Sequence, residues 1–215
     1  MSEAYQVAHI DELEELPVKN GEFVWRPVRR RFGITAFGTN AYTGRAGQRV
    51  IEEHSERDNH QEMYVVLRGR ATFTLGDDEV DAPVGTIVFV QPDTRRGAIA
   101  AEDGTAVLAV GAKPGVVFEP SAWEGVFMAN SYAEQGDLEK ARELMREALE
   151  QHPKAWQGYF NAACLEARLG DRERAFEHLE RAVELEPEQA RAYAAEDSDF
   201  DSIRGDARFE SLVSG

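Results

Sequence analysis

The residues best suited to chemistry lie close together in the first half of the chain. Glu62 follows His60 by two positions and His54 by eight. Residues two apart in an extended strand share a face, so His60 and Glu62 can point into one interior. Imidazole nitrogens and a carboxylate suit a divalent transition metal such as Fe, Mn, Ni or Zn. His54, His60 and Glu62 are therefore the candidate metal ligands.

Two adjacent arginines indicate a different chemistry. Arg95 and Arg96 follow a proline-containing turn, and a guanidinium binds a carboxylate or a phosphate with paired hydrogen bonds. Tyr64 shares the face of Glu62 if the strand is regular. Glu62, Tyr64, Arg95 and Arg96 are thus the candidates for binding a small anionic ligand. The alternative is that Arg95 faces solvent and that Arg96 only neutralises Glu62.

Other kinds of catalytic site find no support in the sequence. It has no Walker loop, no GxGxxG fingerprint and no serine with a histidine partner at motif spacing. No catalytic residue is assigned, and the pattern favours a binding protein over an enzyme. Cys164 is the single cysteine, which excludes an internal disulfide framework and a CxxC zinc site.

The composition narrows the class of protein. The 215 residues include 40 acidic and 24 basic ones, which gives a net charge of −16. This charge has the wrong sign for binding nucleic acid or an anionic membrane. No apolar run approaches the ~20 residues of a membrane span, and the first twenty residues lack the pattern of a signal peptide. We expect a cytoplasmic protein.

The elements that must position the candidate residues change in character near residue 120. Before it, short runs rich in β-branched and aromatic residues, such as EMYVVLRG and GTIVFVQPD, predict an antiparallel β-barrel or sandwich. After it, apolar residues recur three and four apart, which predicts helices. We place an N-terminal arm at 1–22, the barrel at 23–112, a linker at 113–121 and a helical domain at 122–215.

Two motifs in the β half carry a family resemblance. The first is Glu62, six intervening residues and Gly69, and the second is Pro83-Val84-Gly85, a strand and a turn that ends at Arg96. With the strand pattern, they resemble the cupin family of double-stranded β-helix (jelly-roll) barrels. The resemblance implies a homodimer and a metal held by two histidines, the Glu and a later histidine. Here the first two positions fall in SERDN (55–59), and the last is Arg96.

This departure leaves three interpretations of the barrel. The favoured one is a barrel without a cofactor, in which Arg96 takes the place of the metal by pairing with Glu62. A permanent cation disfavours a divalent metal beside it, because a barrel interior screens charge poorly. The second is a metal-dependent cupin enzyme of the isomerase or dioxygenase type. The third is an adventitious or non-standard metal site that uses His54, His60 and Glu62.

The helical half repeats with a period of 34 residues. Gly136-Asp137 aligns with Gly170-Asp171, and the same shift aligns Ala141 with Ala175, Ala148 with Ala182, and Pro153 with Pro187. This pattern resembles the tetratricopeptide repeat, a pair of antiparallel helices. Each glycine is expected to end a first helix in a left-handed conformation, each aspartate to cap a second helix, and the alanines to allow close helix crossing. We predict repeats at 122–155 and 156–189 and a capping segment at 190–215.

The sequence thus predicts a two-domain β + α protein, with an N-terminal cupin barrel and C-terminal antiparallel helix pairs of the tetratricopeptide type. Its expected function is binding. The barrel takes a small anionic ligand or mediates dimerisation, and the helices contact a protein partner, as the second resemblance implies.

Overall fold

The computed structural model describes residues 5–18, 21–56, 59–120 and 122–214. The predicted arm, the SERDN stretch, the linker and the capping segment each include one or more residues outside these ranges. The chain forms two compact units, Met1–Pro120 and Ser121–Gly215, which are described separately. None of the helices in the described ranges has the length and apolar character needed to cross a membrane.

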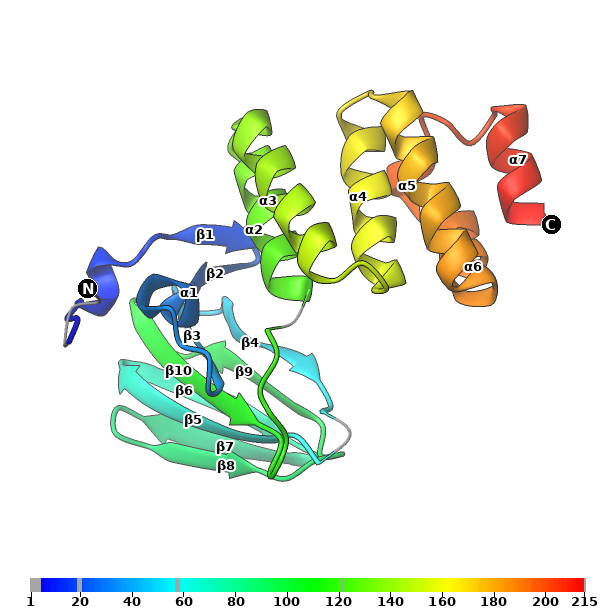
Figure 1. The fold of residues 1–215 in the computed structure, drawn as a ribbon. Helices are drawn as coiled ribbons and strands as arrows, with labels where there is room; N and C mark the ends of the chain where they lie inside the picture. Colours follow the sequence, from blue (N-terminus) through cyan, green and yellow to red (C-terminus); the bar gives the residue numbers. More distant parts are fainter. Residues whose placement is uncertain (1–4, 19–20, 57–58, 121, 215) are drawn as a thin grey trace. The chain divides into compact units, whose positions relative to one another are not determined.

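The first unit is built from two antiparallel sheets (Figure 1). The larger has the order β1-β2-β3-β10-β5-β8 and the smaller the order β4-β9-β6-β7. The elements are η1 (Ile10–Glu12), β1 (Leu16–Val18), β2 (Phe23–Arg26), α1 (Val28–Phe32), β3 (Gly38–Gly44), β4 (Arg49–His54), β5 (Gln61–Arg68), β6 (Arg70–Leu75), β7 (Asp78–Pro83), β8 (Ile87–Val90), β9 (Arg96–Ala100) and β10 (Thr105–Ala112). The predicted jelly-roll architecture is confirmed.

The barrel core lies between the two sheets. Tyr64 and Val66 of β5 and Val107 of β10 meet Phe73 of β6 and Ala98 of β9, and each of them is at most 3% exposed. The neighbours Met63 and Leu67 on β5 are 36% and 43% exposed. This alternation is the period-two pattern of a strand with one buried face, so it fixes which β5 side chains look into the barrel.

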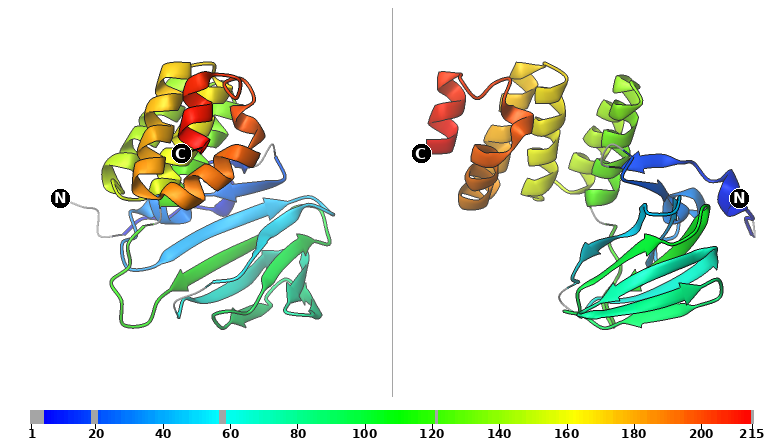
Figure 2. Two further views of the ribbon diagram at one scale, coloured as in Figure 1. Left: turned by 90° about the vertical axis from the view of Figure 1, so that its right-hand side faces the viewer. Right: turned by 180° about the vertical axis from the view of Figure 1, so that it is seen from behind.

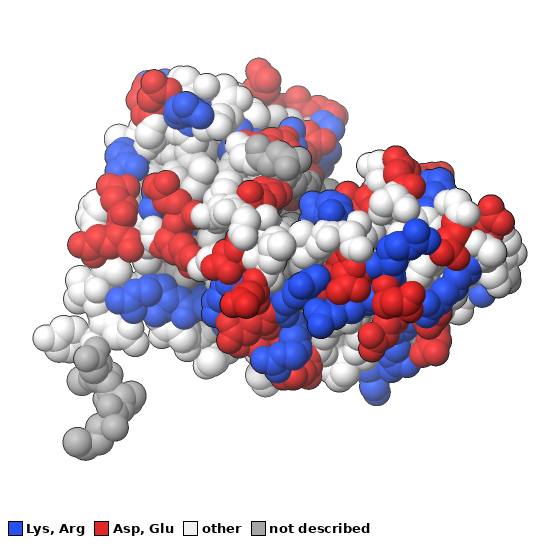
Figure 3. Space-filling model, turned by 90° about the horizontal axis from the view of Figure 1, so that it is seen from above, with Lys and Arg blue, Asp and Glu red and all other residues white. Residues whose placement is uncertain are grey.

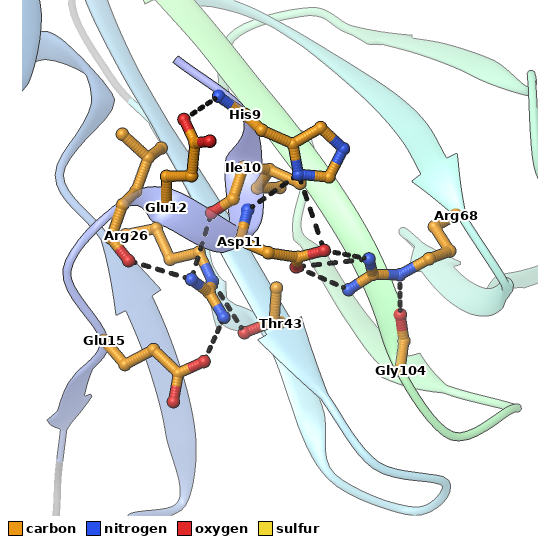
Figure 4. Close-up of polar contacts among 10 residues, drawn as sticks. His9, Ile10, Asp11, Glu12, Glu15, Arg26, Thr43, Arg68 and Gly104 are labelled. Atoms are coloured by element: carbon orange, nitrogen blue, oxygen red, sulfur yellow. Dashed lines mark hydrogen bonds and ion pairs between the residues drawn. The ribbon is translucent and has the colours of Figure 1, made fainter.

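The segment before β2 is fastened to the barrel by two arginines (Figure 4). Arg26 is 3% exposed, and its Nη1 donates to the carbonyl oxygens of Ile10 (3.0 Å) and Leu13 (2.9 Å). Arg68 grips the Asp11 carboxylate with both terminal nitrogens. The segment predicted as an arm therefore packs on its own barrel and contributes β1, which pairs with β2.

The second unit is a row of antiparallel helices, best followed in the two views of Figure 2. The helices are α2 (Ala122–Glu134), α3 (Leu138–Gln151), α4 (Trp156–Arg168), α5 (Arg172–Leu185), α6 (Pro187–Glu196), η2 (Ser198–Phe200) and α7 (Ala207–Ser214). Figure 3 shows acidic and basic side chains interspersed over the face of the molecule seen there.

The local predictions for the repeats are confirmed. Gly136 and Gly170 have φ angles of 86° and 79°, a region that glycine enters without strain. Asp137 caps α3 by accepting a hydrogen bond from the backbone of Lys140, and Asp171 caps α5 in the same way. The four repeat alanines are all buried, at 5% exposure or less: Ala141, Ala148, Ala175 and Ala182.

The end of the second unit closes its core. After α6, Phe200, Ile203 and Phe209 fold back into the same cluster as α4 and α5, and each is at most 3% exposed. Trp156 at the start of α4 stacks on Tyr193 of α6, with ring centroids 5.7 Å apart. Helix α6 thus packs on the second helix pair as the next first helix of a repeat would.

Candidate functional site

The candidate site lies inside the barrel, at the end where β4, β5 and β9 bring polar side chains inward. Strand β5 contributes Glu62 and Tyr64 to this interior. Strand β9 contributes Arg96, whose register partner on β4 is His54. The Tyr64 hydroxyl donates to Glu62 Oε2 at 2.5 Å, so the two side chains share one face as the strand period predicts.

Glu62 is the centre of the group because three cationic or donor groups converge on it. Besides Tyr64, the His54 Nε2 lies 3.3 Å and the Arg96 Nε 3.4 Å from the same oxygen, Oε2. Burial by itself would raise the pKa of the Glu62 carboxyl, but the hydrogen bonds from His54 and Tyr64 and the charges of His54 and Arg96 lower it below its ordinary value. Glu62 is therefore ionised at neutral pH.

His54 is oriented by the backbone of its own strand. Its Nδ1 lies 2.8 Å from the carbonyl oxygen of Glu52, and this contact makes Nδ1 the donor and directs Nε2 towards Glu62. Burial acts to lower the pKa of His54, but the contacts with Glu62 and Glu52 and the charge of Glu56 raise it above the ordinary value. Burial, and then the charge of Glu62, raise the pKa of Tyr64, which keeps its hydroxyl protonated.

The two candidate arginines lie in different environments. Arg96 has no exposed surface. Its Nη2 donates to the carbonyl oxygen of Gln91 at 3.1 Å, whereas its Nε and Nη1 are buried without a hydrogen-bond partner among the described residues. Arg95 is half exposed and contacts Glu53 (3.3 Å) and the carbonyl oxygen of Gly76. The structure brings Arg96 to Glu62 and leaves Arg95 at the surface.

His60 lies beside the group and does not join it. Its Nε2 occupies the space next to Gly111, where a Cβ would come within 2.5 Å, so a larger residue at 111 would displace the imidazole from this position. Its Nδ1 is 3.9 Å from Glu56. The potential ligand atoms that do cluster, all within 4.8 Å of one another, belong to His54, Glu56 and Glu62. Glu56 was not among the sequence candidates because it follows the end of β4, where no strand alternation assigns a direction.

A resident metal of the kind implied by the cupin resemblance fits these residues poorly. The oxygen that would bind it, Glu62 Oε2, already faces Tyr64, His54 and Arg96. The guanidinium stays protonated at any relevant pH, so a divalent ion on this oxygen would face a fixed positive charge in a poorly screened interior. The donor set contains one histidine at the cluster, whereas the family pattern uses three. We therefore derive no chemistry through a metal here.

The helical unit has a groove of its own. It has a volume of about 640 Å³, and α3, α4 and α5 line it. Its lining includes Met145, Leu149 and Tyr159, together with the ion pair between Arg142 and Glu166. Such a surface combines apolar area with fixed charges, as protein-binding surfaces commonly do.

Comparison with known proteins assigns both units. Residues 43–111 match the family described as Cupin domain, and residues 122–163 and 157–189 each match a family described as Tetratricopeptide repeat. No curated protein matches the chain.

Solved structures similar to the chain include proteins described as cupins. They include a cupin protein from Bacteroides fragilis (20% identity, TM-score 0.42, covering 56% of this chain and 93% of that one). A second is an RmlC-like cupin from Desulfovibrio desulfuricans (28% identity, TM-score 0.41, covering 50% of this chain and 97% of that one). A third is a predicted oxalate decarboxylase from Thermotoga maritima (16% identity, TM-score 0.43, covering 50% of this chain and 99% of that one). On the family matches, the chain carries a cupin domain over residues 43–111, followed by tetratricopeptide repeats over residues 122–163 and 157–189.

Proposed function

We propose that this chain is a binding protein whose cupin domain holds a small anionic ligand without a metal, and whose helices bind a protein partner. The observation that carries the proposal for the barrel is Arg96. A fully buried guanidinium lies 3.4 Å from Glu62 at the position where the family resemblance places a metal ligand. It supplies the positive charge that a metal would otherwise supply.

The charges of the group support an anion as the ligand. Arg96 is positive and Glu62 negative, and the raised pKa of His54 adds a second positive charge as the pH falls. The free Nη1 of Arg96 gives an oxyanion a donor that is already desolvated. Hydrogen bonds between ionised groups are stronger than neutral ones, so one such contact can hold a small ligand.

The helical unit supports the second part of the proposal. Tetratricopeptide repeats present grooves to partner peptides, and the groove lined by α3, α4 and α5 includes both apolar and charged side chains.

Calorimetric titration of the full chain with acetate, propionate and inorganic phosphate tests the barrel proposal. Wild type and Arg95→Gln are expected to bind at least one of these anions equally well, and Arg96→Gln to bind it at least about tenfold more weakly. Arg96→Lys keeps a charge and serves as a second variant if Arg96→Gln is unstable. Equal binding by wild type and both Arg96 variants, or no binding of any anion, contradicts the proposal.

A second candidate function is favoured by the cluster of His54, Glu56 and Glu62. It is a metal-dependent cupin enzyme of the isomerase or dioxygenase type. This candidate requires that a metal displace the contacts of Arg96 and Tyr64 with Glu62. Metal content separates the two candidates directly.

A further inference from the structure

Besides the Nε and Nη1 of Arg96, the buried side-chain atoms without a hydrogen-bond partner among the described residues include one on the facing sheet, the Oδ1 of Asn40. Asn40 is on β3, where its cross-strand partner is Ala109 of β10, and Ala109 pairs in turn with Tyr64 of β5. Asn40 shares its face with Tyr42, which packs against the barrel core. The side chain of Asn40 therefore points inward, in the same row as Tyr64, and its Oδ1 is buried without a hydrogen-bond partner among the described residues.

The two unpartnered groups have opposite hydrogen-bonding character. Arg96 Nη1 on β9 is a donor, whereas Asn40 Oδ1 on β3 is an acceptor. The two strands belong to different sheets (Figure 1), and packed sheets lie about 10 Å apart. Buried polar groups in native proteins nearly always have partners. One molecule a few atoms long, with an acceptor at one end and a donor at the other, can satisfy both.

We propose that the barrel ligand is a small monocarboxylic acid that carries a hydroxyl or ammonium group, and that Asn40 selects for this group. A carboxylate oxygen accepts from Arg96 Nη1, and the hydroxyl or ammonium donates to Asn40 Oδ1. This inference rests on the proposed function and adds to it the class of ligand and a specificity residue.

The surroundings of Arg96 favour a single negative charge on the ligand. The Glu62 carboxylate lies against the same guanidinium, so a dianion such as phosphate would place its additional charge near an ionised carboxylate. Like charges at short range in a poorly screened interior repel strongly. A monocarboxylate uses the free donor and leaves the pair of Arg96 and Glu62 in place.

Two series of acids with matched carbon skeletons test the inference on the full chain by calorimetry. The first is propionate, lactate and alanine, and the second is butyrate, 3-hydroxybutyrate and 3-aminobutyrate. In at least one series, the acid with a donor group is expected to bind at least about tenfold more tightly than the unsubstituted acid. The lactate and alanine arms tell a hydroxyl from an ammonium ligand.

Substitutions on β3 assign the preference to Asn40. Asn40→Leu, which keeps the branched shape of the side chain but has no polar atom, is expected to bring the affinity ratio close to one. Asn40→Asp is expected to shift the preference towards the ammonium acid. Thr39→Val is the matched control: Thr39 is the adjacent residue on the opposite face of β3, it donates to the carbonyl oxygen of Ala109, and its loss is expected to leave the ratio unchanged.

The outcomes separate this inference from the proposed function. If substituted and unsubstituted acids bind wild type equally and Arg96→Gln weakens both, the anion site stands and the inference about Asn40 is wrong. A preference that survives in Asn40→Leu also overturns it. If no carboxylic acid binds wild type, the inference fails, and the proposed function fails with it only if inorganic phosphate does not bind either. Equal binding of substituted and unsubstituted acids by wild type contradicts the inference without any variant. If Asn40→Leu does not fold, Asn40→Asp, which keeps the size of the side chain, assigns the preference.

Discussion

At the residue scale, the barrel site depends on one oxygen atom. Glu62 Oε2 is shared by the Tyr64 hydroxyl, His54 Nε2 and Arg96 Nε, and no exposed surface remains on Arg96. A buried ion pair adds little net stability compared with apolar residues of the same size, but removal of one partner strands the other charge. The loss of one partner is therefore expected to cost more stability than the intact pair contributes.

The first prediction concerns this asymmetry. Glu62→Gln is expected to lower the unfolding free energy of the barrel by about 3–5 kcal/mol, and the double variant Glu62→Leu/Arg96→Met by much less. Glu53→Gln, which breaks the half-exposed pair with Arg95, is the control and is expected to cost no more than about 1 kcal/mol. Hydrogen exchange of barrel peptides under increasing denaturant measures each change. A double variant as unstable as Glu62→Gln contradicts the prediction.

The second prediction concerns pH. The pKa of His54 is raised above the ordinary 6.5, so its stabilising contribution is complete below about that pH and is lost as the pH rises through the folded-state value. The pKa of Glu62 is lowered below the ordinary 4.5, so its contribution is present above that pH and is lost in acid. The pair of His54 and Glu62 is therefore expected to stabilise the barrel most between these two pH values.

The difference in barrel stability between wild type and His54→Gln measures the histidine term. It is expected to shrink as the pH rises above about 6.5. The substitution His152→Gln, in the helical unit, controls for general effects of the substitution on the titration. The prediction is contradicted if the difference in stability stays constant from about pH 5 to about pH 9, a range that spans the histidine pKa.

Some residues of the site can be predicted from the local sequence, and others only from contacts between distant parts of the chain. Glu62 and Tyr64 share a face because the strand period is local, and Arg96 is identified by its place in a family motif. Glu56 and Asn40 are different: one lies beyond a strand end, and the other becomes a site residue only through pairing of β3 with β10. The register between two strands far apart in the sequence cannot be predicted from the residues next to Asn40.

At the element scale, the helix pairs depend on small residues at their crossings. A Cβ built on Gly125 of α2 would lie 2.6 Å from the Cβ of Ala148 on α3. Both atoms are attached directly to helix backbones, so neither can move aside without shifting a helix. The close crossing predicted for Ala148 is thus matched by a glycine on the facing helix.

The third prediction is that Gly125→Ala destabilises the helical unit. Alanine gains about 1 kcal/mol over glycine in a helix, whereas overpacking costs about 1–3 kcal/mol; at so short a distance we expect the strain to exceed the gain by about 1 kcal/mol. Thermal unfolding followed by circular dichroism at a helical wavelength measures the change. Gly205→Ala, where no atom lies within 4 Å, is the control. A more stable Gly125→Ala variant contradicts the packing.

The helices and strands differ in how well their local sequence predicts them. The caps at Asp137 and Asp171 and the left-handed glycines act within a few residues, so the repeat pattern predicts them directly. Strand β1 has only three residues, Leu16–Val18, one of them a proline, and no alternation marks it. It forms because β2 offers a partner and because Leu16 is fully buried, which is a tertiary effect that overrides weak local preference.

At the scale of the whole molecule, one face of the barrel presents rows of apolar residues on its outer side. Phe89 and Ile87 of β8 are 55% and 64% exposed. Two rows of outward residues continue from them across β5 and β10, and they consist of Phe89–Met63–Val110 and Ile87–Val65–Leu108. None of the six carries a charge, although the chain has a net charge of −16. Exposed apolar patches of this kind mark interaction surfaces.

The fourth prediction is that two copies of the chain associate through this face. Acidic surfaces of two copies repel each other elsewhere, whereas the uncharged rows meet without that cost. Analytical ultracentrifugation is expected to give twice the mass of one chain for wild type and for Ile99→Glu, and the mass of one chain for Phe89→Glu. Ile99 is 41% exposed on the other sheet, which makes it the matched control. A wild-type monomer, or a Phe89→Glu dimer, contradicts this interface.

The central claim is that Arg96 and Glu62 occupy the place of a metal centre. The most direct test is the metal content of full-length protein purified without a metal-chelating tag and without added metal, measured beside His54→Ala and Glu62→Ala. The account predicts far less than one equivalent of Fe, Mn, Ni or Zn in all three proteins. Close to one equivalent of a single metal in wild type, lost in both variants, would contradict it.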